Sequence, residues 1–515
     1  MSKQFKDYKL SAEILKSLDL MGYKEPTSVQ EHVMNDILNQ KDLIVKSQTG
    51  SGKTAAFAIP VCELVEWEEN KPQALVITPT RELAMQVKEE FFNVGRYKKI
   101  KACAVFGKAP FHIQARELKQ KMHVVVGTPG RLNDHLEQGT FDTSMIKYLI
   151  IDEADEMLNM GFIEQLQDII KELPTDRVTL LFSATIPEDI KSLCDQYMKS
   201  PDMIEIKSES NALDRIVQKK YEIDQRDKFD LMRDLTIIEN PDTCMIFSNT
   251  RIGVDEIYEE LKQLGYPCGR IHGGMNQRDR MREMDSFKKG KFRYLVATGV
   301  AARGIDVDDV SLVINFDLPE DAESYVHRIG RTGRKGKEGL AISFVTDRDG
   351  EFIEAIEEYT GNALEMPDFP TEEAVQGALE IFEEKLNTRP EKKEDKGAKL
   401  NADILKIHIN AGKKQKMRAA DIVGTLCNIE GMTKDDIGII NIMDISTYVE
   451  VLHGKGPMVL NVLQKKPLKG RIRKVNKADD ELFPGERRAR RGRDFEAKNH
   501  SDRRSNRSHS DKKRR

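Results

Sequence analysis

The chain contains 515 residues, of which 33% are charged and 39% hydrophobic, so its length predicts about three to four domains rather than one core. This composition, with a net charge of −4, excludes a fibrous or wholly disordered protein. The six scattered cysteines exclude a disulfide framework or zinc site and indicate a reducing compartment. Residues 1–20 lack the apolar segment of a signal peptide and no run of about 20 apolar residues occurs, so we expect a cytoplasmic protein without a membrane segment.

Short apolar runs rich in β-branched residues recur through the first 200 residues, each followed by a polar turn and a helix-like segment. Val29, Val33 and Ile37 have the spacing of one such helix. Continuous apolar runs that alternate with helices predict parallel strands buried on both faces. The predicted strands are 43–45, 74–77, 123–126, 148–151 and 178–182, and after Pro201 the pattern restarts with 245–247, 294–297, 312–315 and 341–345. We therefore predict two successive α/β units, at 1–207 and 213–365.

The remaining chain divides into a linker, a small domain and a tail. Residues 366–401, with the charged run 387–399, are expected to form a linker. Residues 402–478 predict a βαββαβ domain, the layout of an RNA-recognition-motif (RRM) fold, in the order strand 404–409, helix 417–429, strand 437–443, strand 447–452, helix 457–464 and strand 471–475.

Residues 479–515 form an Arg-rich tail that we expect to be disordered. From 487 to 515 the chain holds 13 Lys and Arg against 4 Asp and Glu, a charge of +9. Such an arm favours a polyanionic partner, but a solvated tail without a partner would have the same composition.

The first predicted strand leads into a glycine-rich loop that resembles a phosphate-binding P-loop. In that loop consecutive backbone N–H groups would surround phosphates at the start of a helix. Lys53 would reach the β- and γ-phosphates of a nucleotide, and Thr54 would ligate Mg²⁺. The broad P-loop pattern has glycine where this chain has Ser47. The loop residues are Ser47, Gln48, Thr49, Gly50, Ser51, Gly52, Lys53 and Thr54.

The strand predicted at 148–151 ends in the acidic sequence Asp152-Glu153-Ala154-Asp155. An acid at the carboxyl end of such a strand would lie beside the P-loop. Asp152 could hold Mg²⁺ through water, and Glu153 could orient and polarise the attacking water. Acidic residues also occur at helix starts for electrostatic reasons alone. The acidic sequence indicates a nucleotide site here because it follows a P-loop and ends a predicted strand.

With this P-loop, the sequence Asp-Glu-Ala-Asp resembles the DEAD-box RNA helicases, and further motifs follow in family order across residues 1–365. The resemblance implies two tandem RecA-like domains, ATP and Mg²⁺ as cofactors, and RNA as partner. It implies a Q motif formed by Phe5, Tyr23, Thr27 and Gln30. In this motif the glutamine reads the edge of the adenine and the phenylalanine stacks on the base. It implies RNA contacts by Thr80, Arg81, Thr128 and Arg131, and a link between hydrolysis and domain closure through Ser183 and Thr185.

In the second domain the resemblance implies RNA contacts by Thr250, Arg251 and Thr298. It also implies ribose binding by Asp306, a coupling role for His327, and arginine fingers at Arg331 and Arg334. The chain departs from the family pattern at Lys108, where a second glycine often follows Gly107, and at Gly299, where an aspartate often stands. Because the catalytic set is divided between two domains, hydrolysis would require their closure, which ATP and RNA would both favour.

The predicted C-terminal domain lacks the aromatic RNP1 signature of sheet-binding RRM domains and offers mainly Tyr448 for stacking. Its basic residues, among them Lys413, Lys414, Arg418 and Arg473, would bind phosphates of structured RNA, unless they form only a solvated surface. Residues 409–414, 436–439 and 454–457 resemble the C-terminal domain of bacterial DbpA-type helicases. That resemblance implies a hairpin of 23S ribosomal RNA as target, in pre-50S particles during assembly of the large ribosomal subunit. We expect a monomer.

Three other functions fit part of the sequence. An ATP-gated RNA clamp or RNA–protein remodeller would use the same ATPase without duplex unwinding. A DNA helicase could share the fold, although the Q motif and the RRM-like domain favour RNA. An RNA-binding protein with an inactive core is disfavoured because Lys53, Glu153 and Arg331 are all present.

Overall fold

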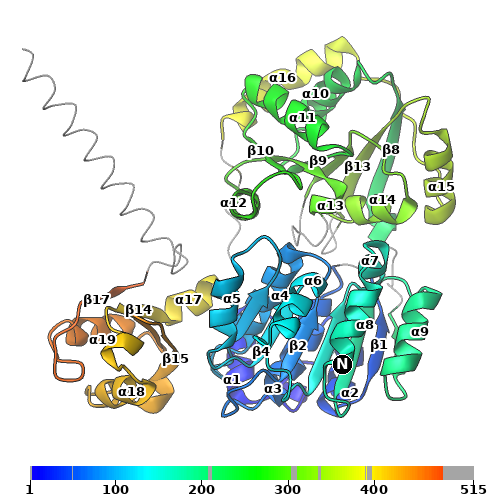
Figure 1. The fold of residues 1–515 in the computed structure, drawn as a ribbon. Coiled ribbons are helices and arrows are strands. Elements are labelled where there is room, and N and C mark those ends of the chain that lie inside the picture. Colours follow the sequence, from blue (N-terminus) through cyan, green and yellow to red (C-terminus); the bar gives the residue numbers. More distant parts are fainter. Residues whose placement is uncertain are drawn as a thin grey trace, which may run out of the picture. The chain divides into compact units, whose positions relative to one another are not determined.

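A computed structural model describes residues 3–48, 50–206, 212–302, 310–333, 338–388, 390 and 397–478, without the side chains of residues 212, 214, 300 and 302. The predictions made for Thr49, Asp306, Arg334 and the tail at 479–515 lie outside these residues. The chain forms two compact units, Met1–Leu400 and Asn401–Arg515. The first unit contains two domains that each surround a parallel sheet (Figure 1).

The first domain has a seven-stranded parallel sheet in the order β3-β4-β2-β5-β6-β1-β7. Its strands are β1 Leu43–Lys46, β2 Ala74–Ile77, β3 Ala102–Val105, β4 Val124–Gly127, β5 Tyr148–Asp152, β6 Val178–Ser183 and β7 Asp202–Glu205. Its helices are the 3₁₀ helix η1 Phe5–Asp7 and α1 Ala12–Leu20, α2 Ser28–Leu38, α3 Lys53–Leu64, α4 Arg81–Val94, α5 Phe111–Leu118, α6 Pro129–Glu137, α7 Ala154–Asn159, α8 Ile163–Lys171 and α9 Glu188–Tyr197.

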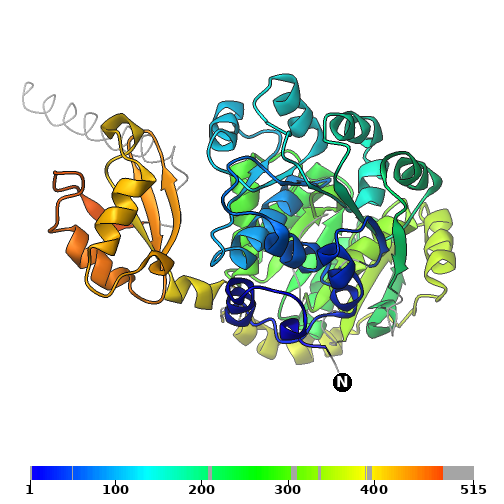
Figure 2. The same cartoon turned by 90° about the horizontal axis from the view of Figure 1, so that it is seen from below.

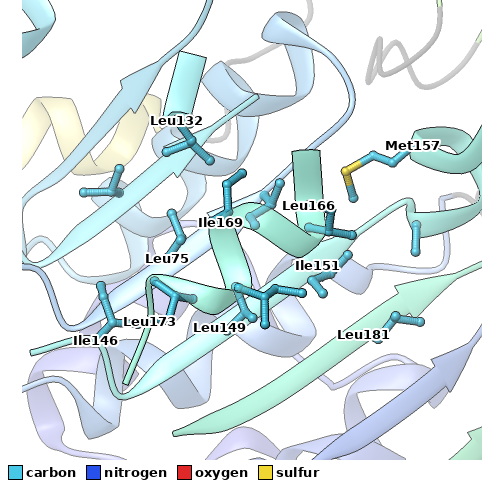
Figure 3. Packing of buried hydrophobic residues seen from close by; sticks show 14 of the residues in the cluster. Leu75, Leu132, Ile146, Leu149, Ile151, Met157, Leu166, Ile169, Leu173 and Leu181 are labelled. Atoms are coloured by element: carbon cyan, nitrogen blue, oxygen red, sulfur yellow. The ribbon is translucent and has the colours of Figure 1, made fainter. Parts of the chain in front are cut away.

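Both faces of this sheet are buried, as its continuous apolar strands predict. In β5, Leu149 and Ile151 point into the core under α8, which contributes Leu166 and Ile169 (Figure 3). Their neighbours Tyr148 and Ile150 lie on the opposite face and are equally inaccessible. Because side chains alternate along a strand, this pattern requires helices on both sides of the sheet, which the ribbon views show (Figures 1 and 2). The rigid sheet fixes the loops at its carboxyl edge.

The second domain has a six-stranded parallel sheet in the order β10-β11-β9-β12-β13-β8. Its strands are β8 Ile216–Glu222, β9 Cys244–Ser248, β10 Cys268–Ile271, β11 Tyr294–Thr298, β12 Leu312–Asn315 and β13 Gly339–Val345. Its helices are η2 Ala212–Arg215, α10 Lys228–Glu239, α11 Arg251–Gln263, α12 Gln277–Lys288, α13 Gly299–Ala302, α14 Ala322–Ile329, α15 Gly350–Thr360 and α16 Glu372–Leu386. The two parallel sheets confirm the predicted pair of α/β domains.

The linker expected over 366–401 differs from the structure at α16. This helix packs on the second domain, where Phe382 is buried with its ring centroid 5.4 Å from that of Tyr266. Lys385 donates to the backbone carbonyl of Asn240 at 2.6 Å and forms an ion pair with Asp242 at 2.7 Å. We missed the helix because a third of its residues are glutamate and only one narrow face is apolar. It belongs to the second domain.

The C-terminal unit contains α17 Ala398–Asp403, which begins just before it, and then β14 Leu405–Ile409, η3 Lys413–Gln415, α18 Ala419–Cys427, η4 Lys434–Asp436, β15 Ile437–Ile442, β16 Thr447–Val451, α19 Gly456–Leu463 and β17 Val475–Lys477. The sheet is antiparallel in the order β15-β16-β14-β17. The predicted βαββαβ order is confirmed, but the last strand is not at 471–475. Its pairing with β14 begins only at Val475.

Within the described ranges, no helix is both long enough and apolar enough to span a lipid bilayer.

Candidate functional site

The P-loop connects β1 to α3 and is held by its own lysine. Lys53 is the first residue of α3, is buried, and donates from Nζ to the backbone carbonyl of Ser47 at 3.1 Å. The amide of Ser47 in turn donates to the carbonyl of Ser183 at 2.9 Å, which joins this loop to the end of β6. The amino group of Lys53 therefore lies within the curve of the loop, where phosphates of a nucleotide would be received.

Two residues of the predicted Q motif hold the P-loop from outside. Thr27 donates from Oγ1 to the carbonyl of Ser51 at 2.9 Å, and Gln30 donates from Nε2 to that of Gly52 at 3.2 Å. Gly52 has φ of +91°, and a Cβ atom there would lie 2.8 Å from Nε2 of Gln30. Glycine is required at this position both by the backbone and by the close approach of Gln30.

The aromatic residues predicted for adenine lie together at the start of the chain. Phe5 is buried, and its ring meets that of Tyr23 edge to face at 6.2 Å between centroids. The hydroxyl of Tyr23 donates to Glu90 at 2.7 Å, which ties this segment to α4.

Asp152 and Glu153 lie at the carboxyl end of β5, beside Lys53. Burial raises the pKa of Asp152 to about 7, although the charge of Lys53 lowers it. Asp152 Oδ1 is buried and accepts no hydrogen bond from the described residues, as a carboxylate that ligates a metal in the working site would. Glu153 has a left-handed φ of +55°, which is uncommon for a residue other than glycine and turns the chain sharply into α7. These residues fit a Mg²⁺–nucleotide complex.

Asp155 joins the acidic motif to the residues that follow β6. Its Oδ2 accepts hydrogen bonds from the amides of Ala184 at 3.0 Å and Thr185 at 2.9 Å, while its own amide donates to Ser183 Oγ at 3.1 Å. Sequence reasoning named Ser183 and Thr185 but not the carboxylate that fixes them. These bonds tie the acidic motif after β5 directly to the end of β6.

The RNA-contacting motifs predicted in the two domains have the same local structure. Thr80 caps α4 by accepting from the amide of Leu83 at 3.2 Å, and Thr250 caps α11 by accepting from that of Gly253 at 2.9 Å. Each helix N-terminus thus presents N–H groups and a positive dipole end, which favour a phosphate. Thr128 stands at the N-cap of α6, and Thr298 ends β11.

The predicted RNA-binding arginines of the first domain are already engaged by protein groups. Arg131 donates from Nη1 to Gln114 Oε1 at 2.8 Å and to the Ala109 carbonyl at 2.9 Å. Arg81 donates to Oε1 of Gln277 on α12 at 2.9 Å, and Gln277 donates to Glu82 at 3.0 Å. These bonds join α4 of the first domain to α12 of the second.

Helix α14 carries the predicted arginine motif of the second domain. Arg331 follows the helix, is buried, and donates from Nε to the carbonyl of His327 at 3.2 Å. His327 lies with Nδ1 3.9 Å from Oε2 of Glu156 on α7. Arg251, predicted to contact RNA, is exposed at the start of α11.

Sequence reasoning missed Arg328 in this motif. It is buried and donates to the carbonyl of Asp317 at 2.8 Å and to Asn249 Oδ1 at 2.8 Å. Its guanidinium carbon lies 5.3 Å from the ring centroid of Phe247. Its position in the arginine motif was a signal, but its partners lie in the loops after β12 and β9, 11 and 79 residues away in the sequence.

The basic residues predicted in the C-terminal unit lie on its surface loops. Lys413 and Lys414 are exposed in η3, whose amides donate at 2.8 Å to the carbonyls of Met443 and Asp444 in the β15–β16 turn. Arg418 is exposed at the N-cap of α18, and Arg473 is half-buried before β17. The lysines form a positively charged edge held against a turn.

The duplicated parallel sheets, the P-loop beside an acidic strand end and the arginine motif on the second sheet define a two-domain nucleotide-hydrolysing helicase core. Sequence profiles agree: that of the DEAD/DEAH box helicase family matches residues 27–193, that of the helicase conserved C-terminal domain matches 227–336, and that of the DbpA RNA binding domain matches 406–477. The chain belongs to the DEAD-box family of ATP-dependent RNA helicases, and within it to the DbpA type.

Named relatives support both the assignment to the family and the assignment to the DbpA type. The chain is 56% identical to the ATP-dependent RNA helicase DbpA of Bacillus subtilis over 475 residues, 92% of this chain and 99% of that protein. It is 43% identical to the DEAD-box ATP-dependent RNA helicase CshA of Geobacillus kaustophilus, over 74% of this chain and 82% of the relative. Among solved structures, S. cerevisiae Dbp5 bound to RNA and ADP BeF3 matches 75% of this chain and all of its own, at 32% identity and a TM-score of 0.65.

Proposed function

We propose that this RNA helicase acts as a cytoplasmic monomer on 23S ribosomal RNA, in pre-50S particles during assembly of the large ribosomal subunit. The observation that carries the proposal is the C-terminal domain, which matches the DbpA RNA binding domain over 406–477 and keeps a four-stranded sheet with lysines on its loops. The helicase core would supply general RNA remodelling, and this domain would supply the choice of RNA.

ATP hydrolysis in the proposed mechanism depends on Lys53, Asp152 and Glu153 of the first domain. Lys53 would hold the transferred phosphate, and Glu153 would orient the attacking water and accept its proton. Thr54 and Asp152 would hold Mg²⁺, which when bound neutralises charge on the phosphates.

RNA dependence follows in this mechanism from the division of the site. Arg331 lies on the second domain, together with the RNA contacts proposed for Thr250, Arg251 and Thr298. An arginine finger is worth about 10³–10⁵ in rate in measured nucleotide hydrolases, so turnover would be slow until both domains grip one RNA strand. RNA and ATP would each stabilise the closed state and thereby each increase the affinity for the other.

The test is steady-state ATPase with no RNA, with unrelated bulk RNA, and with a fragment that carries the large-subunit ribosomal hairpin. We expect the hairpin fragment to stimulate at far lower concentration than bulk RNA. The double variant Lys413→Ala/Lys414→Ala should lose this preference while keeping stimulation by saturating RNA, and Lys434→Ala, another exposed lysine of the same domain, serves as control. Equal stimulation by every RNA in the wild type would refute the proposed target.

A strand-displacement assay on a short duplex attached to that hairpin separates unwinding from an ATP-gated clamp. ATP-dependent release of the short strand supports the unwinding activity, whereas retention of the strand with full ATPase supports the clamp.

A further inference from the structure

The two sheets of the first unit are repeats of one topology. Numbered within their own domains, the strands lie in the order 3-4-2-5-6-1 in both sheets, and β7 is added at one edge of the first. Strand β8 therefore corresponds to β1, and β12 corresponds to β5. The loops that follow corresponding strands meet at corresponding points of the carboxyl edge, which is where α/β sheets bind ligands.

A lysine and an aspartate of the second domain occupy the positions that hold the nucleotide in the first. Lys53 is the first residue of α3 after β1, and Lys228 is the first residue of α10 after β8. Asp152 ends β5, and Asp317 lies two residues beyond the end of β12. A pocket of about 490 Å³, lined in part by Lys228 and Asp317, lies at this edge of the second sheet.

The two lysine–aspartate pairs differ in their contacts. In the first domain Lys53 donates to the loop carbonyl of Ser47, and Asp152 Oδ1 accepts no bond from the described residues. In the second domain Lys228 Nζ contacts Asp317 Oδ1 directly at 3.2 Å, and the lysine side chain is only 2% exposed. The second pair is thus closed on itself, where the first is arranged to receive a ligand.

Asp317 uses its other carboxylate oxygen to fix the loop before α11. Its Oδ2 accepts from Ser248 Oγ at 2.6 Å and from the amide of Asn249 at 3.1 Å. Thr250, the next residue, caps α11 and is the proposed RNA contact. The position of the RNA-contacting loop therefore depends on the orientation of the Asp317 carboxylate.

Asp317 and Asn249 also hold α14, the helix that carries the arginine motif. Arg328 donates to the carbonyl of Asp317 at 2.8 Å and to Asn249 Oδ1 at 2.8 Å. Three residues later in the chain comes Arg331, the proposed arginine finger. The path from Thr250 to Arg331 thus consists of the peptide bond to Asn249, the hydrogen bond from Arg328 to Asn249, and the hydrogen bond from the amide of Arg331 to the carbonyl of Arg328 at 3.2 Å.

Lys228 is buried and Asp317 is 22% exposed, so their ion pair is half-buried. Such a pair is weak evidence for stability, because desolvation offsets its attraction, and apolar residues of similar volume often replace one without loss. The closed Lys228–Asp317 pair is therefore better explained by the orientation that it imposes. The lysine charge holds Oδ1, which leaves Oδ2 directed at the loop.

We propose that Lys228 is a positioning residue that, through Asp317, couples RNA contact at the start of α11 to the arginine motif on α14. This inference rests on the RNA and arginine-finger roles proposed above. It predicts that loss of the lysine charge reduces the effect of bound nucleotide on RNA affinity. A purely structural role would lower only the stability of the domain.

The experiment compares Lys228→Met with wild type in the full chain, by measuring RNA affinity with and without a non-hydrolysable ATP analogue. Allosteric coupling of this kind is typically about 5–150-fold. We expect the wild-type ratio of the two affinities to lie in that range and the ratio in Lys228→Met to fall toward one. ATPase assays should show a higher RNA concentration for half-maximal stimulation at nearly unchanged RNA-free rate, and Lys228→Arg should restore much of the coupling.

Lys220→Met is the matched control, because it breaks another half-buried ion pair of this domain, with Glu357 at 2.9 Å, remote in sequence from the loop of Ser248. Its melting temperature should fall while its affinity ratio stays at the wild-type value. An unchanged ratio in Lys228→Met, or an equal loss in Lys220→Met, would overturn the positioning role. Absence of RNA-stimulated ATPase in the wild type would instead refute the proposed function on which the inference rests.

Discussion

At the scale of single residues, the candidate site depends on side chains that are each fixed by one or two specific bonds. Glu153 differs from its neighbours because its backbone is left-handed. Asp152 and Asp155 are both buried, and the carboxylate of Asp155 is bonded to the amides of Ala184 and Thr185. The chemical step is therefore expected to be sensitive to the carboxylate of Glu153 itself.

Substitution Glu153→Gln should lower the ATPase rate by about 10²–10⁴, the usual contribution of a positioned acid–base group, while ATP and RNA still bind. The measurements are steady-state ATPase and RNA retention in a gel-shift assay. Glu164→Gln, which neutralises an exposed carboxylate on α8, should retain the wild-type rate. Near-normal turnover in Glu153→Gln would show that the catalytic carboxylate lies elsewhere.

Gly52 permits the contact between the P-loop and the Q motif. In Gly52→Ala the new Cβ would meet Gln30 and the backbone would be strained, so we expect the KM for ATP to rise roughly tenfold. Gly139→Ala is the matched control, since Gly139 has a φ of +60° but no atom within 4 Å of its Cβ position. It should lower stability by about 1 kcal/mol without changing the KM. Equal KM values in the two variants would contradict the contact with Gln30.

Sequence reasoning identified the residues of the motifs but not their supporting partners. Lys53 and Asp152 lie in the P-loop and in the Asp-Glu-Ala-Asp sequence, which are recognisable motifs. Lys228 and Asp317 are 89 residues apart, and neither was singled out by a sequence motif. The same holds for Asp155, whose bonds to Ala184 and Thr185 join separate strands. A role that consists of a contact between distant residues requires knowledge of the fold.

At the scale of elements, the strands that the sequence predicted in the two parallel sheets are those in the middle of each sheet. Residues 74–77 and 312–315 are strands at the predicted bounds, and the other strands predicted in the two parallel sheets shift by one or two residues. The last strand of the C-terminal sheet begins four residues later than predicted. The strands that were missed, β3, β7, β8 and β10, are the edge strands of the two parallel sheets. An edge strand is less enclosed, so it need not be a continuous apolar run and gives a weaker signal.

Helix α16 should contribute strongly to the stability of the second domain. Truncation of a buried phenylalanine costs about 3–5 kcal/mol, so Phe382→Ala should increase hydrogen exchange of the β9 and β11 amides. Ile381→Ala, at a neighbouring side chain that is 65% exposed, should leave exchange unchanged. If the β9 and β11 amides exchange at similar rates in both variants, the packing of α16 contributes little to the stability of the second domain.

Two buried histidines of the first domain should make its stability depend on pH. Burial lowers the pKa of His123 and of His135 to about 4, below the ordinary 6.5. Between pH 6.5 and about 4 the unfolded chain therefore binds protons that the folded domain does not, and stability falls as the pH falls through this range. Each pKa unit corresponds to about 1.4 kcal/mol at most, and below about pH 4 the effect levels off.

The single tryptophan, Trp67, lies in this domain, and its carbonyl is 3.1 Å from His123 Nε2, so its fluorescence can follow urea unfolding at each pH. His135→Gln should reduce the pH slope, and His32→Gln, at an exposed histidine, should not. A slope unaffected by His135→Gln would show that other groups cause the acid sensitivity.

At the scale of the whole molecule, the basic tail should act as an electrostatic arm. Removal of residues 479–515 takes away a net charge of +5, including the basic run 487–515 with its charge of +9, and should weaken RNA binding mostly at low salt. Each lost phosphate contact should reduce the slope of log affinity against log salt by about 0.7–0.9. RNA affinity measured from low to high salt gives this slope for both chains, and an unchanged slope would exclude tail–phosphate contacts.

The position of α16 has a consequence for synthesis of the protein on the ribosome. Phe382 covers Tyr266, but it is translated more than 100 residues later and about 50 residues after the arginine motif. At 5–20 residues per second, roughly three to ten seconds separate Arg334 from Leu386. During that interval the nascent second domain holds all of its motifs while the aromatic surface around Tyr266 still faces water, which makes it a surface for a ribosome-bound chaperone to shield.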